Sequence, residues 1–449
     1  MDNLSLAGRD LIALWHPCTQ MKDHERQPII PIKSGQGVWL EDYAGKRYLD
    51  AVSSWWVNLF GHAHPYINAA LRRQLDSLEH VIFAGFTHAP AVELAERLLA
   101  LAPPGLARCF YADNGSSAVE VALKMSFHYW RNRGRTGKTR FLALDNGYHG
   151  ETLGALAVGG VGLYKETYAP LLLEVISAPS PDCYGREPGE SWAACSTRKF
   201  ADLERILAER SDEICAVIVE PLVQCAGGMR MYDPVYLSLL RTACDHYGVH
   251  LIADEIAVGF GRTGTFFACE QAGITPDFLC LSKGLTGGYL PLSAVLTREA
   301  VYQAFYADYA EGKAFLHSHS YTGNALACAA ALASLDLFEM ENTLRRNQEL
   351  SRVLAEAAAP FADHPHVAEV RQTGMIVAIE MAKDKRGRTP YDGRERRGLR
   401  VYRHGLERGV LLRPLGDVVY FMPPYVITPE EIRLMAQVAW EGIQLATAG

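Results

Sequence analysis

Short apolar runs alternate with helical patterns between residues 108 and 282, and this alternation restricts the fold more than any other feature. The runs are RCFYAD (108–113), TRFLALD (139–145), CAVIVE (215–220), HLIAD (250–254) and DFLCLS (277–282). Before the fourth run, VYLSLLRTACDHYG has apolar residues at helical spacing and ends at Gly248, a usual residue after a helix C-terminus. Strands that alternate with helices predict an α/β fold, with a mostly parallel central sheet covered by helices on both faces.

The pattern changes after residue 330. A long helical pattern is followed by VAEVRQTGMIVAIEM, a second helix and a pair of apolar strands around Arg413 and Tyr420. We expect a smaller α+β domain built from both chain ends. The predicted division is an N-terminal segment that contributes to the small domain and the substrate pocket, 1–65, a large domain, 66–330, and a C-terminal small domain, 331–449.

Charge and composition narrow the class of partner. The formal net charge is -7 with no strong basic stripe, which disfavours sequence-independent nucleic-acid binding. The longest apolar stretch, ALACAAALASL, is shorter than the roughly 20 residues that span a bilayer, and the N-terminus lacks a signal-peptide pattern. The 10 cysteines form no CxxC pair, which is typical of a reducing compartment. We expect a cytoplasmic protein with small-molecule substrates and neither nucleic-acid nor membrane partners.

Lys283 directly follows the run DFLCLS and precedes the glycine-rich GLTGG. A phosphate-binding P-loop needs its glycines before the lysine, so that interpretation fails. Open α/β sheets bind ligands at the carboxyl ends of their strands, and a lysine buried there has a lowered pKa and a nucleophilic amine. An isolated lysine would more often be a solvated residue at the rim of the sheet.

Asp254 ends the preceding run, HLIAD. An acidic residue in that place is commonly a turn former or a helix cap. In enzymes that use pyridoxal 5'-phosphate, however, a carboxylate pairs with the protonated pyridine nitrogen, so that the ring withdraws electrons. Asp254 and Lys283, at the ends of successive strands, are therefore candidates for the two ends of one pyridoxal ring.

The segment ADNGSSAVE (112–120) is a candidate seat for the cofactor's phosphate. It reads as a strand end, a tight turn and a helix start with the capping-box spacing Ser117 to Glu120. The free amides, hydroxyls and dipole of such a helix start suit an anion. Tyr148 follows another strand, where it would either stack on a planar ring or belong to the core or rim.

Several of these motifs together resemble the class III, fold-type I pyridoxal-phosphate aminotransferases. They are DNGSSAVE, Asp254-Glu255-Ile256, Gly259 with GRTG, and PDFLCLSKGLTGG, and the resemblance extends over nearly the whole chain. It implies pyridoxal 5'-phosphate as cofactor and a homodimer whose active sites lie at the subunit interface.

The resemblance also implies roles for single residues. Lys283 would form the Schiff base with the cofactor and move the substrate proton, while Asp254 holds the pyridine nitrogen. Further contacts implied around the cofactor are Ile256 and Tyr148 on the two ring faces, Glu220 and Gln224 on the hydroxyl side, Gly115, Ser116 and Ser117 at the phosphate, and Ser320 reaching the phosphate of the partner subunit.

Four segments narrow the resemblance within the family. They are LWHPCTQM (14–21), DAVSSWWVNLFGHAHP (50–65), THAPAVELAERL (87–98) and LLRPLGDVVYFMPPY (411–425). All are similar to the members that convert 8-amino-7-oxononanoate to 7,8-diaminononanoate in biotin biosynthesis, with S-adenosylmethionine as amino donor. The implied substrate-binding residues are Trp55 and Trp56 as apolar walls, Tyr148, Tyr420, a partly buried Arg413 that would bind a carboxylate, and Arg262, which would either gate the site or brace its loop.

Two positions depart from the pattern of the family. Cys18 stands where several members have tyrosine, and Glu151 stands where others have aspartate. Neither change touches the cofactor chemistry, but both loosen the assignment of the amino donor and of the pocket's shape.

Two alternatives compete with this interpretation. The first is another class III ω-aminotransferase, using an amine or ω-amino acid with pyruvate or 2-oxoglutarate. The second is a metal-dependent hydrolase, because His62 and His64, and likewise His317 and His319, are spaced like metal ligands. Both pairs lie in loops rich in Gly, Pro or Ser, so we expect no metal.

Overall fold

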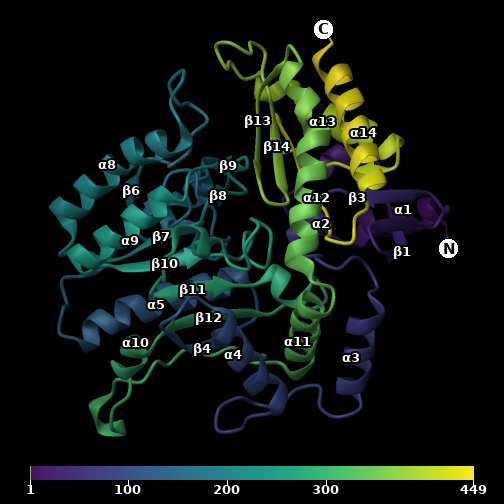
Figure 1. Cartoon of the computed structure of the whole chain (residues 1–449). Coiled ribbons are helices and arrows are strands. Elements are labelled where there is room, and N and C mark those ends of the chain that lie inside the picture. The colour runs from purple at the N-terminus through teal and green to yellow at the C-terminus, as the bar shows by residue number, and fades with distance from the viewer. Residues whose placement is uncertain (1, 449) are drawn as a thin grey trace.

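Seven strands form the central sheet of the computed structural model, which describes residues 2–448 (Figure 1). Their spatial order is β4-β12-β11-β10-β7-β5-β6, and only β12 runs antiparallel to its neighbours. The predicted α/β architecture with a mostly parallel sheet is confirmed. The strands are β4 (Leu106–Ala112), β5 (Arg140–Leu144), β6 (Ile176–Ala178), β7 (Ile214–Val219), β10 (His250–Asp254), β11 (Phe278–Leu281) and β12 (Ser293–Arg298).

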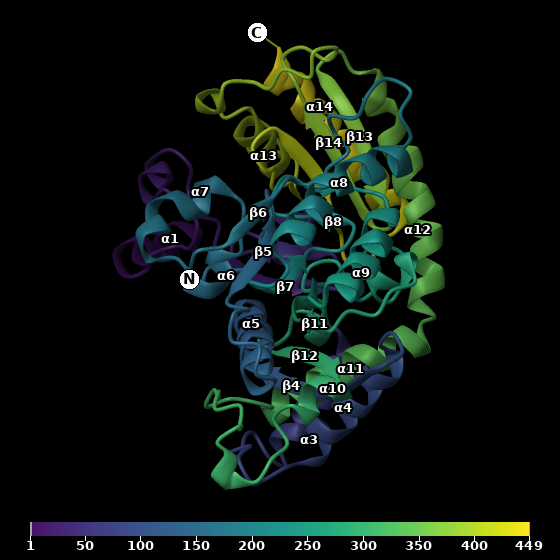
Figure 2. The same ribbon diagram turned by 90° about the vertical axis from the view of Figure 1, so that its left-hand side faces the viewer.

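Helices cover both faces of this sheet, and the side chains of the strands alternate between two apolar cores. Ile218 and Ile252 pack in the core that includes α5, whereas Val217 and Leu251 pack in the core that includes α4, α8 and α9. Figure 2 shows where these helices lie relative to the strands. The helices of this part are α3 (Pro65–Leu75), α4 (Ala89–Leu101), α5 (Gly115–Asn132), α6 (Leu153–Ala157), α7 (Gly162–Lys165), α8 (Trp192–Arg210), α9 (Val235–Tyr247) and α10 (Glu299–Gln303).

Both chain ends build the smaller domain. Strand β15 pairs in parallel with β3, so the C-terminal part completes an N-terminal sheet of order β1-β2-β3-β15. A second, antiparallel sheet has the order β13-β14-β16. The strands are β1 (Ile32–Gln36), β2 (Trp39–Asp42), β3 (Arg47–Asp50), β13 (Val367–Thr373), β14 (Ile376–Met381), β15 (Val410–Leu411) and β16 (Val418–Phe421).

Two expectations for the C-terminal part were wrong. The strands around Arg413 and Tyr420 do not pair with each other, because β15 joins the N-terminal sheet and β16 joins β14. The single long helix is two helices, interrupted at Asn342, whose φ of 49° breaks the helical path. The remaining helices are α1 (Asn3–Ala13), α2 (Ser53–Trp56), α11 (Ala325–Met340), α12 (Thr343–Ala358), α13 (Arg397–Glu407) and α14 (Pro429–Thr447).

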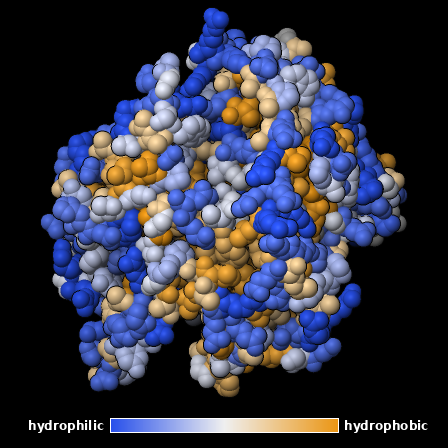
Figure 3. Space-filling view, in the orientation of Figure 1, coloured by the Kyte–Doolittle hydropathy of each residue, from blue (hydrophilic) through white to orange (hydrophobic). Residues whose placement is uncertain are grey.

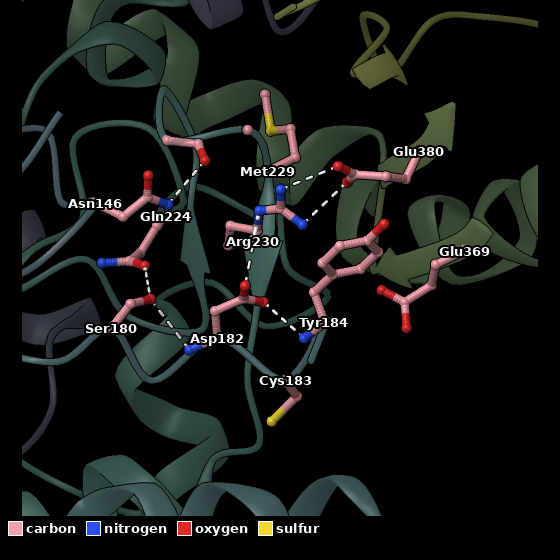
Figure 4. A network of polar contacts seen from close by, with 12 residues as sticks. Asn146, Ser180, Asp182, Cys183, Tyr184, Gln224, Met229, Arg230, Glu369 and Glu380 are labelled. Atoms are coloured by element: carbon pink, nitrogen blue, oxygen red, sulfur yellow. Dashed lines mark hydrogen bonds and ion pairs between the residues drawn. The ribbon is translucent and has the colours of Figure 1, made fainter. Parts of the chain in front are cut away.

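A buried ionic network joins the large domain to the β13-β14-β16 sheet (Figure 4). The short hairpin of β8 (Val223–Gln224) and β9 (Arg230–Met231) brings Arg230 to Glu380, with both carboxylate oxygens bound at 3.1 and 3.0 Å. Arg371, which is 3% exposed, pairs with Glu380 at 2.8 Å and donates to the carbonyl oxygen of Met229 at 2.7 Å. These bonds fix the hairpin to the small domain.

The surface carries both apolar and hydrophilic residues. Apolar residues gather near the middle of the face seen in Figure 1, among hydrophilic residues at its margins (Figure 3). Within residues 2–448, none of the helices combines the length and apolar character needed to cross a membrane.

Candidate active site

Asp254 and Lys283 lie at the same edge of the central sheet. Strands β10 and β11 are parallel neighbours, with Asp254 opposite Cys280, so both strands end on one side. Lys283 begins a short 3-10 turn (η4, Lys283–Thr286) with a φ of 48°, a conformation that is strained for a residue other than glycine. Burial lowers the pKa of Lys283, and the nearby Cys225, Asp254 and Glu220 oppose that shift. The sheet therefore presents an amine and a carboxylate at the same edge.

Asp254 is held by a histidine that the sequence analysis did not identify. Its Oδ2 lies 2.7 Å from Nδ1 of His149, and its Oδ1 accepts a hydrogen bond from the amide of Ile256 at 3.1 Å. Both side chains are almost fully buried, at 1% and 4% exposure. The available signal was the position of His149 directly after Tyr148, in the loop that follows strand β5.

The start of α5 does not contain the predicted capping box. The helix begins at Gly115, with Asn114 as N-cap accepting from the amide of Ser117 at 3.0 Å. The first two amides, of Gly115 and Ser116, have no partner within the helix. A Cβ on Gly115 would meet Cγ2 of Ile256 at 2.9 Å, so glycine is what allows Ile256 to lie against the helix start.

Glu120, the expected capping residue of α5, instead binds the start of α6. Its Oε1 accepts hydrogen bonds from the amides of Gly154 and Ala155, at 2.8 and 3.1 Å, at the start of α6. It also accepts from the hydroxyl of Thr152 at 2.6 Å, and Thr152 in turn contacts the hydroxyl of Ser116 at 2.8 Å. Glu120 thus ties the loop after Tyr148 to the anion seat.

Hydrogen bonds to neighbouring loops fix the side chains of Glu220 and Gln224. Glu220 accepts hydrogen bonds from the amides of Tyr148 and Cys225, at 2.8 and 3.0 Å, and burial raises its pKa to about 7. Gln224 accepts from the hydroxyl of Ser180 at 2.6 Å and donates to the carbonyl oxygen of Asp145 at 2.9 Å. Figure 4 shows that these contacts continue through Asp182 to the interdomain network around Arg230.

The two tryptophans belong to a left-handed turn. Residues Ser53, Ser54, Trp55 and Trp56 have φ values of 50°, 45°, 74° and 72°. Trp55 is 42% exposed, with the Arg413 guanidinium 5.2 Å from its ring centroid. Trp56 is 3% exposed, and its Nε1 donates to the hydroxyl of Tyr420 at 3.0 Å. The Nζ of Lys283 lies 4.5 Å from the ring centroid of Trp56.

Two arginines differ from their predicted surroundings. Arg413 is exposed rather than partly buried, and among residues 2–448 it forms no ion pair, so its guanidinium is free for a ligand. Arg262 is 1% exposed and donates to the carbonyl oxygens of Pro423 and Asn58, at 2.6 and 3.2 Å. Through these contacts Arg262 braces two loops, which is one of the two roles that the sequence left open. They do not fit its predicted role in substrate binding.

The two departures from the family pattern are neighbours. The thiol of Cys18 lies 3.7 Å from Oε1 of Glu151, and the hydroxyl of Tyr148 donates to the same oxygen at 3.1 Å. Burial, followed by the charge of Glu151, raises the pKa of the Cys18 thiol. Cysteine and glutamate therefore occupy one place beside the ring of Tyr148.

Ser320 follows His319, whose Nδ1 lies 3.1 Å from Oδ2 of Asp113, the residue just before the anion seat. Ser320 is exposed, in a turn after His319, and the described residues give it no hydrogen bond to Gly115, Ser116 or Ser117. His317 and His319 face each other with their Nε2 atoms 3.1 Å apart, and His62 contacts Asp50 at 3.0 Å. In the part of the chain that the structure describes, no three His, Cys, Asp or Glu side chains form a group able to hold a metal ion.

Comparison with known proteins gives consistent matches over the whole chain. Residues 20–439 match the family described as Aminotransferase class-III. A protein of Helicobacter pylori named adenosylmethionine-8-amino-7-oxononanoate aminotransferase is 51% identical over 435 residues, covering 96% of this chain and 95% of that protein. A protein of Geobacter sulfurreducens with the same name is 46% identical over 449 residues, covering 100% of this chain and 99% of that one.

Solved structures agree with these matches. The crystal structure of the Methanocaldococcus jannaschii protein of the same name is 37% identical, with a TM-score of 0.94 and coverage of 100% of both chains. The structure of an omega transaminase from Pseudomonas jessenii in complex with PMP is 29% identical, with a TM-score of 0.94 and coverage of 98% of both chains.

Proposed function

The chain belongs to the class-III aminotransferase family, and we propose that it transfers an amino group from S-adenosylmethionine to 8-amino-7-oxononanoate, forming 7,8-diaminononanoate for biotin biosynthesis. The observation that carries this choice is the 51% identity, over 96% of the chain, to a relative whose name contains both substrates. The omega transaminase shares the fold equally well, but at 29% identity.

The residues of the site fit pyridoxal 5'-phosphate. The helix start at Gly115 has free amides and two serine hydroxyls for a phosphate, and Gly115 leaves no space for a side chain against Ile256. The site has a buried carboxylate, that of Asp254, and a half-buried amine, that of Lys283, whose pKa is lowered by its surroundings. When bound, this cofactor supplies an aldehyde that combines with amines and a ring that withdraws electrons from the neighbouring carbon.

Lys283 and Asp254 perform the proton chemistry in this proposal. The lowered pKa of Lys283 makes its neutral amine available, first as a nucleophile and then as the base that moves a proton at the substrate carbon. Asp254 holds the proton at the pyridine nitrogen, and His149 fixes the orientation of its carboxylate at 2.7 Å. Burial of both partners excludes water from this pair.

The remaining predicted contacts divide between cofactor and substrate. Arg413, exposed and free of ion pairs among residues 2–448, would bind the carboxylate of 8-amino-7-oxononanoate, with Trp55 packed beneath its guanidinium. Tyr148 would stack on the cofactor ring, with Glu220 fixing its backbone. Gln224 would lie on the cofactor's hydroxyl side.

We also propose a cytoplasmic homodimer with its active sites at the subunit interface. Exposed aromatic and apolar side chains in residues 306–321, the segment that contains Ser320, support a subunit contact, because a monomer rarely leaves such a group in water. They are Tyr306, Tyr309, Leu316 and Tyr321, which are 71%, 102%, 89% and 64% exposed. In such a dimer Ser320 would reach the phosphate bound by the partner subunit.

A half-reaction tests the amino donor. Purified protein loaded with pyridoxal 5'-phosphate is mixed with S-adenosylmethionine alone, and the aldehyde absorbance of the cofactor is followed. We expect S-adenosylmethionine to remove this absorbance and 8-amino-7-oxononanoate to restore it. If L-alanine removes it while S-adenosylmethionine does not, the protein is instead an ω-aminotransferase. Lys283→Ala tests the catalytic lysine, because borohydride should no longer attach the cofactor covalently to the chain.

A further inference from the structure

Two cations lie over the two adjacent tryptophans of the turn Ser53–Trp56. Lys283 Nζ is 4.5 Å from the centroid of Trp56, and the Arg413 guanidinium is 5.2 Å from that of Trp55. Both distances fall within the roughly 6 Å at which a cation is attracted to the face of an aromatic ring. The buried ring of Trp56 meets the half-buried Lys283, and the exposed ring of Trp55 meets the exposed Arg413.

The handedness of the turn makes this arrangement possible, and several bonds maintain it. Four consecutive residues other than glycine adopt positive φ angles, a conformation that such residues avoid unless their surroundings impose it. Asp50 accepts from the amide and the hydroxyl of Ser54, at 3.0 and 2.7 Å, and Ser53 donates to the carbonyl oxygen of Met422 at 2.8 Å. Because several bonds maintain these strained φ angles, we infer that the directions in which Trp55 and Trp56 point are important for function.

The ring of Trp56 is itself locked. Its Nε1 donates to Tyr420 Oη at 3.0 Å, and Tyr420 is 1% exposed within strand β16. The indole is therefore fixed at its far edge, and its face is turned to Lys283. This position suits a residue that acts on the lysine better than a flexible wall along a substrate chain.

The amine of Lys283 has no other close partner. Among residues 2–448 it has no hydrogen bond, and the two carboxylates that act on its charge, those of Asp254 and Glu220, are hydrogen-bonded to other groups. Asp254 binds His149 and the amide of Ile256, while Glu220 binds the amides of Tyr148 and Cys225. The charges of Cys225, Asp254 and Glu220 favour the ammonium form and that of Arg262 opposes it, but none of these groups forms a hydrogen bond with the amine, so the ring of Trp56 is the group that lies over it.

We propose that the face of Trp56 holds the ε-ammonium of Lys283 whenever that amine is not covalently bound, which makes Trp56 a positioning residue for the catalytic lysine. This inference rests on the proposed function, in which Lys283 is released from the cofactor in each half-reaction. The ring keeps the released amine beside the reacting carbon, where it has to take up and return a proton. It also favours the protonated amine, which offsets part of the effect of burial.

The experiment measures the pKa of Lys283 in the full-length protein without cofactor. Only the neutral amine adds to an aldehyde, so the pH dependence of the rate of covalent attachment of pyridoxal 5'-phosphate reports this pKa. In Trp56→Leu we expect the acid dissociation constant of the amine to rise about tenfold, a fall of about one unit in pKa, because the ring no longer stabilises the ammonium. Trp56→Phe, which keeps a ring, should show less than half of this shift.

Trp55→Leu is the matched control, because Trp55 lies on the same turn but faces Arg413. Its pH profile should overlay that of the wild type. If Trp56→Leu does not fold, Tyr420→Phe releases the ring without removing it and should give a smaller shift in the same direction. Profiles of both Trp56 variants that overlay the wild type, with only KM for 8-amino-7-oxononanoate changed, would overturn the proposal and make Trp56 a substrate wall. Covalent attachment that persists in Lys283→Ala would instead contradict the proposed function.

Discussion

Removing the charge of Glu380 should destabilise the protein far more than removing a surface charge. In Glu380→Gln the shape of the side chain is kept, but Arg230 and Arg371 lose a carboxylate that they bind at 3.1, 3.0 and 2.8 Å. Arg371 is 3% exposed, so water cannot replace the lost partner. Removing one member of a buried pair costs about 3–5 kcal/mol. Glu369 still lies 3.5 Å from Arg371, so we expect a loss near the lower end, about 3 kcal/mol.

The assay is urea unfolding followed by tryptophan fluorescence, with saturating pyridoxal 5'-phosphate in every sample. Glu430→Gln is the control, because Glu430 forms a helical surface pair with Arg433 at 3.5 Å, with side chains 79% and 63% exposed. Such a pair contributes about 0.5 kcal/mol or less. If the two variants lose the same free energy of unfolding, the network does not hold the domains together and the argument from burial fails.

Three further outcomes follow from the site. Because burial raises the pKa of Glu220 to about 7 from 4.5, its contribution to stability is complete below pH 4.5 and is lost as the pH rises toward 7. The unfolding free energy of the cofactor-free wild type should therefore fall relative to Glu220→Gln by up to about 1.4 kcal/mol per pH unit in that range, and parallel curves would refute the shift. Arg413→Met should raise KM for 8-amino-7-oxononanoate about tenfold or more with kcat nearly unchanged, and an unaltered KM in steady-state kinetics would remove Arg413 from the carboxylate site. Arg262→Met should lower the unfolding free energy by about 2–4 kcal/mol, because the carbonyls of Asn58 and Pro423 lose their donor, and a change confined to KM would restore the gating role.

The centre of the fold was predictable because buried parallel strands are continuous apolar runs between turn residues. The same reasoning placed Asp254 and Lys283 at one sheet edge, since successive strands of such a sheet end on the same side. The antiparallel strand β12 was missed, because SAVLTR carries no local sign of its direction. The partners of β15 and β16 were also missed, because they depend on strands that lie far away in the chain.

The sequence predicted those site residues whose role follows from their chemical type. It did not predict the roles that arise from contacts formed only in the folded chain. The burial of Arg262 arises from two carbonyl acceptors, on Asn58 and Pro423, that only the folded chain brings together. The left-handed turn at Ser53–Trp56 contains no glycine, the residue that usually signals positive φ. His149 had a local signal, its place after a strand, but its partner Asp254 is remote in sequence.

The left-handed turn has a consequence for engineering. Each residue other than glycine in that conformation lowers the free energy of unfolding by roughly 1 kcal/mol or more. Relieving the strain at Ser53–Trp56 would therefore stabilise the protein. Glycine at Ser54 would relieve part of the strain, yet it would also loosen the two rings and the cations over them. Selection for heat resistance and selection for turnover should therefore favour different residues at this turn. Variants selected only for thermal tolerance should therefore lose catalytic activity.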